Sequence, residues 1–270
     1  TEIKVLKEDQ FGNIWIGTDK GIFRLNEQEI EYWGKEYGLE KLRINTLEID
    51  QDNIIWVGTE NGLYQYDKRK SEMFISLGEL GEVWKIYEDA EGIVWVGTND
   101  GLKRFEKSKV ENIVTNSGNE RENIKFLERS LSGKIWSGSV GKITEHQPNT
   151  GQFSSYDSKD DILSLFVHDE MPWIGCEDKA YFLKDGNWQK SNSPGHYFMG
   201  ISADQKGRMW NRNVSGVHFE NESGVWERFT SNGFFEGELF GLIPGILEDN
   251  DGYFWFRPQF FGYEANDNKI

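Results

Sequence analysis

The stretch that decides the fold is Gly12-Asn13-Ile14-Trp15-Ile16-Gly17-Thr18, because versions of it return six more times along the chain. Two of these copies, at 53–59 and 92–98, are nearly identical to it, whereas the later ones diverge and keep little more than the tryptophan. Seven tryptophans mark the repeat: Trp15, Trp56, Trp95, Trp136, Trp173, Trp210 and Trp255. Their spacings of 41, 39, 41, 37, 37 and 45 residues match the length of four short strands with their turns. The sequence therefore predicts an all-β fold, a single seven-bladed β-propeller of four-stranded antiparallel blades.

One repeat runs from end to end, so we expect a single domain over residues 1–270. The tryptophan positions place the blades at about 1–36, 37–77, 78–117, 118–156, 157–192, 193–230 and 231–270. Few residues follow Glu264, so the last blade could be incomplete.

A second regularity lies six residues before most of the tryptophans, where the chain has Asp9, Asp50, Asp89, Ser130, Asp204 or Asp249. Three residues further on comes Gly12, Asn53, Gly92, Gly133, Gly207 or Gly252. This pattern predicts a tight hairpin in which the Asp or Ser side chain caps the turn and the Gly or Asn adopts a positive φ. The strands before these turns carry apolar residues on both faces, which is typical of strands covered on both sides by neighbouring blades. We expect each repeated Trp to pack between adjacent blades.

Composition excludes several classes of function. The net charge of -16 repels phosphate backbones and anionic lipid, so neither nucleic-acid binding nor membrane binding is expected. The single Cys176 excludes an internal disulfide framework. The sequence contains no long apolar run and no initiator Met, and we therefore expect a mature or excised segment without membrane insertion.

Candidate ligand residues are those that break the repeat at one end of the blades, since the fold does not explain them. Arg212 and Arg257 stand two residues after a repeated Trp, where five other blades have Gly, and two such arginines could clamp a carboxylate or sulfate. The alternative is that they pair with surface acids. Polar residues directly before the inner strands form a second group, and the longest insertion carries two aromatic residues: Arg43, Glu82, Asn123 and Tyr197, then Phe234 and Phe235.

The run Ile44-Asn45-Thr46-Leu47 followed by Ile55-Trp56-Val57-Gly58-Thr59-Glu60-Asn61-Gly62-Leu63-Tyr64 closely resembles the two-component regulator propeller repeat. The match is specific over the first three blades, recognisable in the fourth and weak in the last three. The resemblance implies a seven-bladed propeller of the kind found in periplasmic sensor modules of hybrid histidine kinases, many of which respond to oligosaccharides. It leads us to expect a bacterial periplasmic or extracellular sensor domain that binds an oligosaccharide or an acidic sugar.

Two other functions stay open. Pro194-Gly195-His196 with the following repeat is similar to a repeat of streptogramin lyases. This resemblance implies that His196 is a base and that a magnesium ion is bound. The partner histidine that the resemblance would require is absent, because blade seven contains no histidine. A protein-interaction scaffold is the second alternative, because protein and sugar surfaces both use aromatic and arginine-rich loops. The four histidines have no metal-ligand spacing, and Asp249-Asn250-Asp251-Gly252 lacks the glutamate of a calcium loop, so we predict no metal, no cofactor and no catalytic residue.

Overall fold

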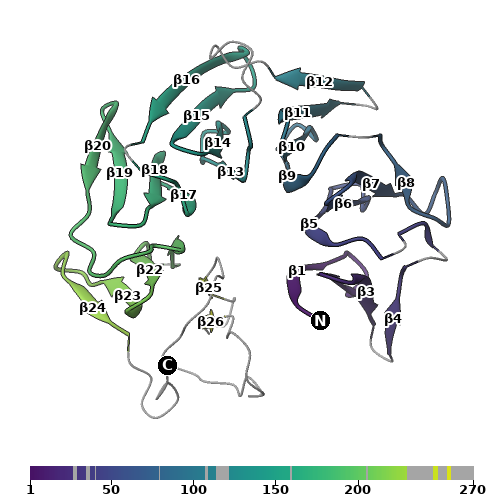
Figure 1. The fold of residues 1–270 in the computed structure, drawn as a ribbon, viewed down its shortest axis with the longest axis horizontal. Coiled ribbons are helices and arrows are strands. Elements are labelled where there is room, and N and C mark those ends of the chain that lie inside the picture. The colour runs from purple at the N-terminus through teal and green to yellow at the C-terminus, as the bar shows by residue number, and fades with distance from the viewer. Residues whose placement is uncertain are drawn as a thin grey trace. The chain divides into compact units, whose positions relative to one another are not determined.

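The computed structural model describes residues 1–26, 29–34, 37–39, 41–78, 80–106, 109–113, 122–158, 160–204 and 206–229, together with the strands Ile246–Glu248 and Phe254–Phe256. These residues form six four-stranded antiparallel sheets and one two-stranded sheet (Figure 1). Consecutive strands pair in each sheet, which confirms four-stranded antiparallel blades for the first six repeats. The two-stranded sheet contains Trp255, and most of the predicted seventh blade lies outside the described residues. The described part of the chain contains no helix long and apolar enough to cross a membrane.

Contacts divide the chain into two compact units. Unit 1 contains Thr1–Arg129, Ser137–Val140 and Glu145–Phe153. Sheets 1, 2 and 3 belong to it. Their strands are β1 (Ile3–Glu8), β2 (Ile14–Thr18), β3 (Gly21–Leu25) and β4 (Ile30–Tyr32); β5 (Ile44–Ile49), β6 (Ile55–Thr59), β7 (Gly62–Tyr66) and β8 (Ile75–Ser76); β9 (Val83–Glu88), β10 (Val94–Thr98), β11 (Gly101–Glu106) and β12 (Lys109–Ile113).

Unit 2 contains Ser130–Trp136, Gly141–Thr144 and Ser154–Ile270. Sheets 5 and 6 and the two-stranded sheet belong to it, and the residues of sheet 4 are divided between the units. The strands of sheets 4, 5 and 6 and of the final pair are β13 (Phe126–Arg129), β14 (Ile135–Ser139), β15 (Lys142–Gln147) and β16 (Gln152–Asp157); β17 (Ser164–His168), β18 (Met171–Gly175), β19 (Ala180–Lys184) and β20 (Asn187–Lys190); β21 (Gly200–Ala203), β22 (Met209–Asn213), β23 (Gly216–Glu220) and β24 (Trp226–Arg228); β25 (Ile246–Glu248) and β26 (Phe254–Phe256).

The capped hairpin is present as predicted. Asp9 Oδ1 accepts the backbone N–H groups of Phe11 and Asn13 at 2.9 and 3.0 Å, and Asn53 replaces the glycine with a φ of 60°. The second carboxylate oxygen has a role that the sequence analysis missed, because it accepts the indole N–H of the repeated Trp six residues later. The Trp-to-Asp distances are 3.0, 2.8, 2.7 and 2.9 Å in sheets 1, 2, 3 and 6. One carboxylate thus fixes both the turn and the tryptophan.

Trp15, Trp56 and Trp95 pack on the following sheet, as predicted, whereas Trp210 contacts Phe219 of its own sheet at a centroid distance of 5.1 Å. Trp15 contacts the ring of Tyr66 at a centroid distance of 6.3 Å, and Trp56 contacts Phe105 at 5.8 Å. Trp95 contacts the imidazole of His146 in the same way at 6.3 Å. The three partners end the third strand of sheets 2, 3 and 4, so the repeat uses one site for this contact.

The first strands of sheets 2, 3 and 4 are covered on both faces, with Ile44, Leu47, Val83 and Ile86 at most 1% exposed. Sheet 1 differs from the prediction, because Ile3 and Leu6 are 42% and 56% exposed.

Candidate functional site

The end of each sheet at which its first strand begins and its second strand ends is termed the upper end. In unit 1 the chain closes this end with paired hydrogen bonds. The backbone N–H of Asn99 donates to the carbonyl of Glu82 at 2.9 Å, and Asn99 Oδ1 accepts the backbone N–H of Glu82 at 3.1 Å. Arg43 and Glu60 form the same pair in sheet 2. Residues at the upper end are therefore held in place by the backbone, while their side chains are free to vary.

Arg43 and Glu82, two predicted site residues, meet at the upper end. Arg43 Nη2 lies 2.5 Å from Glu82 Oε1, and Arg43 Nε lies 3.7 Å from Glu60 Oε2. Asn45 Nδ2 donates to Glu82 Oε1 at 3.2 Å and to the Val83 carbonyl at 3.0 Å. The Arg43 charge is balanced by two carboxylates, so this position does not attract an anion.

Asn123, a third predicted site residue, precedes β13 at the upper end. Its Oδ1 is buried from water and has no hydrogen-bond partner among the described residues. The indole N–H of Trp84, on β9, is in the same situation. The ammonium of Lys125 lies 6.0 Å from the Trp84 ring centroid, which links β9 to the segment that carries Asn123. An acceptor and a donor are therefore left without partners at the upper end of sheets 3 and 4.

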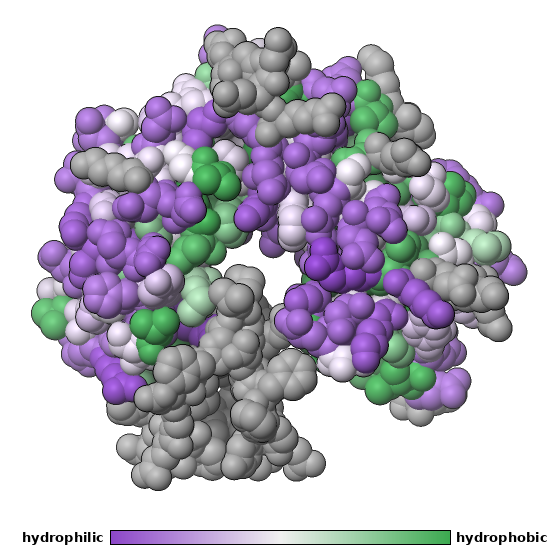
Figure 2. All heavy atoms as spheres, in the orientation of Figure 1, coloured by the Kyte–Doolittle hydropathy of each residue, from purple (hydrophilic) through white to green (hydrophobic). Residues whose placement is uncertain are grey.

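Hydrophilic residues cover the region of β1, β5 and β9 on the face shown in Figure 2. Lys7 Nζ lies 2.9 Å from Glu48 Oε2 and joins β1 to β5. Polar contacts therefore link the first strands of sheets 1, 2 and 3, through Lys7 and Glu48 and through Asn45 and Val83.

Arg212 is buried, with only 5% of its surface exposed, and burial lowers the pKa of its guanidinium. The matching glycines explain this placement. A Cβ at Gly58 would lie 2.5 Å from a Val83 side-chain atom, and one at Gly97 would lie 2.8 Å from the Ile124 carbonyl oxygen. This position faces the next sheet, so a side chain placed there is directed into the protein. The repeated glycine at this position is the signal in the sequence that could have indicated a buried site.

Tyr197 and His196 lie in unit 2, before β21. Tyr197 is 44% exposed, has a φ of 53°, and donates its hydroxyl to Glu177 Oε1 at 2.6 Å. This bond raises the pKa of Tyr197. His196 is exposed. The described residues contain no group of three or more His, Cys, Asp and Glu side chains that could hold a metal. Arg257, Phe234 and Phe235 lie outside the described residues.

The repeat and its sheets agree with the relatives of this chain. The family description "Two component regulator propeller" matches residues 38–61 and 78–100. The solved extracellular domain of BT4673 from B. thetaiotaomicron, described as a one-component system in one structure and as a hybrid two-component system in another, superposes with a TM-score of 0.72 to 0.73 at 18% identity over 94% of this chain. The fold is a β-propeller. The chain spans 36 to 37% of those BT4673 domains.

Other propellers are similar in fold at comparable distance. Virginiamycin B lyase from Staphylococcus aureus has a TM-score of 0.67 at 14% identity, over 86% of this chain and 85% of the lyase. YCF48, solved with a D1 peptide, has a TM-score of 0.64 at 15% identity, over 84% of this chain and 80% of YCF48. No curated protein matches the chain in sequence. At these identities the shared feature is the propeller fold.

Proposed function

We propose that the chain is a non-catalytic recognition module of an extracytoplasmic bacterial sensor, and that it binds a neutral oligosaccharide at the upper end of unit 1. The match to the two-component regulator propeller and the likeness to extracellular domains of a bacterial two-component system support the sensor assignment and the location.

The observation that carries the ligand class is the pair of partnerless atoms, the Trp84 N–H and Asn123 Oδ1. A buried donor or acceptor without a partner costs about 1–3 kcal/mol, which a ligand can recover by supplying the partner. Hydroxyl groups both donate and accept, and could thus supply a partner to an unpartnered donor and to an unpartnered acceptor. The Arg43 charge is already balanced by Glu60 and Glu82, which favours a neutral sugar over an acidic one.

Titration calorimetry of the purified chain against neutral and acidic oligosaccharides tests this proposal. We expect a neutral sugar to bind, and Asn123→Leu to weaken it by about tenfold, equal to about 1.4 kcal/mol. The same substitution removes an unpartnered acceptor, so the thermal unfolding temperature should stay level or rise. Gln10→Ala, at an exposed turn of sheet 1, is the control that should change neither result.

Binding that is unchanged in Asn123→Leu would place the ligand elsewhere. Preferential binding of an acidic sugar would instead favour the alternative in which Arg212 and Arg257 clamp the ligand. Failure of every sugar to bind would contradict the proposal and leave docking of a protein partner as the alternative.

A further inference from the structure

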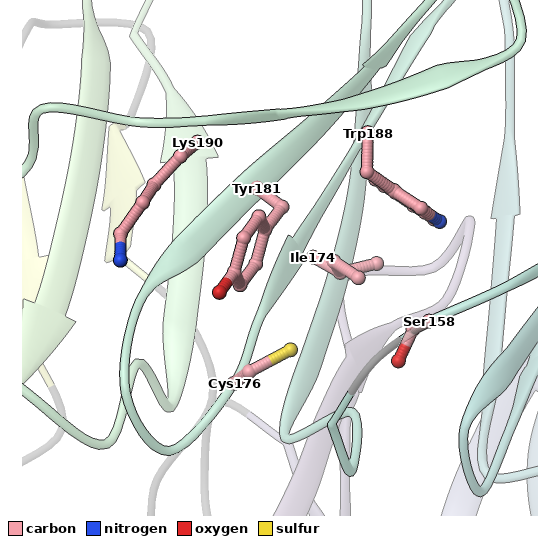
Figure 3. Close-up of a pocket in the computed structure, with 6 residues that line it drawn as sticks. All are labelled: Ser158, Ile174, Cys176, Tyr181, Trp188 and Lys190. Atoms are coloured by element: carbon pink, nitrogen blue, oxygen red, sulfur yellow. The ribbon is translucent and has the colours of Figure 1, made fainter.

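A cavity of about 250 Å³ lies in unit 2, between the segment that follows β16 and the outer strands of sheet 5. Ser158, Ile174, Cys176, Tyr181, Trp188 and Lys190 line it. Figure 3 shows Ile174, Cys176 and Tyr181 in the middle, with Lys190 on one side and Trp188 and Ser158 on the other. None of these residues was singled out as a site by the repeat.

The corresponding space in sheets 1 and 2 is filled. Val57 and Tyr64 are cross-strand neighbours on β6 and β7, as Ile174 and Tyr181 are on β18 and β19. In unit 1 the segment between sheets 1 and 2 adds Leu39, which is fully buried, and Tyr37 to the cluster that contains Val57 and Tyr64. The segment between β16 and β17 is shorter and places Ser158, Asp160 and Asp161 there instead. The cavity therefore follows from the loss of apolar linker residues.

Both aromatic side chains of the cavity are fixed at their polar ends. Trp188 Nε1 donates to the Asp157 carbonyl at 2.8 Å, and the Tyr181 hydroxyl lies 3.1 and 3.2 Å from the two Asp178 carboxylate oxygens. Among the described residues, neither ring stacks on another aromatic ring or lies beneath a cation. Two immobilised aromatic rings beside a cavity form a preorganised platform for an apolar ring face.

Charge narrows the class of ligand. Burial raises the pKa of the Cys176 thiol to about 12, and the negative charges of Asp160, Asp161 and Asp178 contribute to this rise. The same negative charges would repel an anionic ligand. The Lys190 ammonium on the cavity wall, 3.8 Å from Asp178 Oδ2, disfavours a cation. The cavity volume equals the volume that about eight water molecules occupy in liquid water. This volume suits a ligand with one ring and not an oligomeric chain.

We propose that this cavity binds a single uncharged sugar ring, or another ring-sized polyol, with an apolar face on Trp188 and Tyr181 and hydroxyls toward Ser158 and Lys190. This second site lies in a different unit from the upper-end residues and does not rest on the proposed function.

Cys176 provides a direct readout, because it lines the cavity and the sequence contains a single cysteine. The chain would be treated at alkaline pH with a small uncharged alkylating reagent, in the presence of a neutral hexose, an amino sugar or a hexuronate. At about nine times its Kd, a neutral hexose should slow alkylation about tenfold by occupying the cavity. No protection by any neutral hexose, or protection by only the charged sugars, would overturn the proposal.

Ser158→Leu supplies the apolar linker side chain that unit 1 has and unit 2 lacks. It should abolish hexose binding in calorimetry with thermal unfolding maintained. Ser154→Leu, a matched change at an exposed position of β16, should bind as the unaltered chain does. Hexose binding that survives in a folded Ser158→Leu would overturn the assignment, and Asn123→Leu separates this site from the upper end because only upper-end binding should respond to it.

Discussion

Sheets 1–3 in unit 1 and sheet 5 in unit 2 come from one repeat, yet their turns and tryptophans are held differently. In unit 1 each turn carboxylate holds its tryptophan, and the first two sheets share a junction filled by Trp33, Leu39 and Phe74. In unit 2 the turn of sheet 5 is a two-residue loop with positive φ at Asp169 and Glu170, and no carboxylate in the described part of the chain caps it in the manner of Asp9. Trp173 there contacts the ring of Phe182 in its own sheet at a centroid distance of 4.8 Å.

This difference between sheets 1–3 and sheet 5 indicates which parts of the repeat tolerate substitution. Pairing of consecutive strands persists in both units, so the sheet itself survives the loss of the cap. What changes is the space between sheets, where shortened or polar segments leave a cavity or buried polar groups such as Asn211 and His218 in place of apolar contacts. Divergence of the repeat is thus a guide to candidate sites in this molecule.

The largest expected effect comes from removing a cap in unit 1. Asp89 is 2% exposed and accepts hydrogen bonds from Trp95 Nε1 and from the backbone of Glu91 and Ile93. Asp89→Ala leaves these donors unpaired, and we expect unfolding free energy to fall by about 3 kcal/mol in denaturant titration. Ser130→Ala, at the same position of sheet 4, should cost less than about 1 kcal/mol. Equal losses of unfolding free energy in the two variants would contradict the proposal that the carboxylate cap of sheet 3 contributes more than Ser130 of sheet 4.

A similar effect should come from pH through His146, which is 3% exposed and takes the position of Tyr66 and Phe105. Burial lowers the pKa of His146 from 6.5 to about 4. Since the folded pKa lies below the unfolded one, the neutral imidazole contributes full stability above pH 6.5 and loses it as pH falls toward 4. Between pH 7 and 4.5 the loss due to this group should be about 2–3 kcal/mol.

His146→Phe should remove that part of the acid sensitivity, as seen by comparing unfolding free energies at pH 7 and 4.5. Tyr66→Phe is the control at the equivalent site, with no titration in this range. A pH dependence that is the same in His146→Phe as in the unaltered chain would contradict burial of a neutral imidazole. In His146→Phe the Ser137 hydroxyl, which lies 2.9 Å from His146 Nε2, loses its partner. The test therefore compares how the unfolding free energy changes with pH in the two proteins, and not its absolute value.

The smallest effect is a gain. In sheet 4 Ser130 takes the position of the capping Asp, and its hydroxyl lies 3.0 Å from the Ser132 hydroxyl. The indole N–H of Trp136 is buried without a partner among the described residues. Ser130→Asp restores the carboxylate of the other sheets and should add about 1 kcal/mol. Glu170 binds the Ser132 N–H and hydroxyl at 2.6 Å each, and its charge opposes the new one. The gain should therefore be clearest when Ser130→Asp is added to Glu170→Gln, and a double variant less stable than Glu170→Gln would contradict it.

The strand order and the capped turns could be predicted from the sequence, because each depends on residues close together in one repeat. Asp9 and Trp15, or Asp50 and Asn53, lie within one hairpin, where spacing fixes geometry. The sequence also identified Arg43, Glu82 and Asn123 as residues that the fold does not explain.

Only the tertiary structure decided what those residues do. Arg43 is neutralised by Glu82 of the next sheet, Arg212 is buried because its position faces a neighbouring sheet, and the cavity beside Trp188 opens where a linker carries Ser158 in place of apolar side chains. Each outcome depends on how closely segments from different repeats approach, and no spacing within a repeat sets that distance. Hydrogen-bond satisfaction and packing between sheets are settled only when all the sheets are in place.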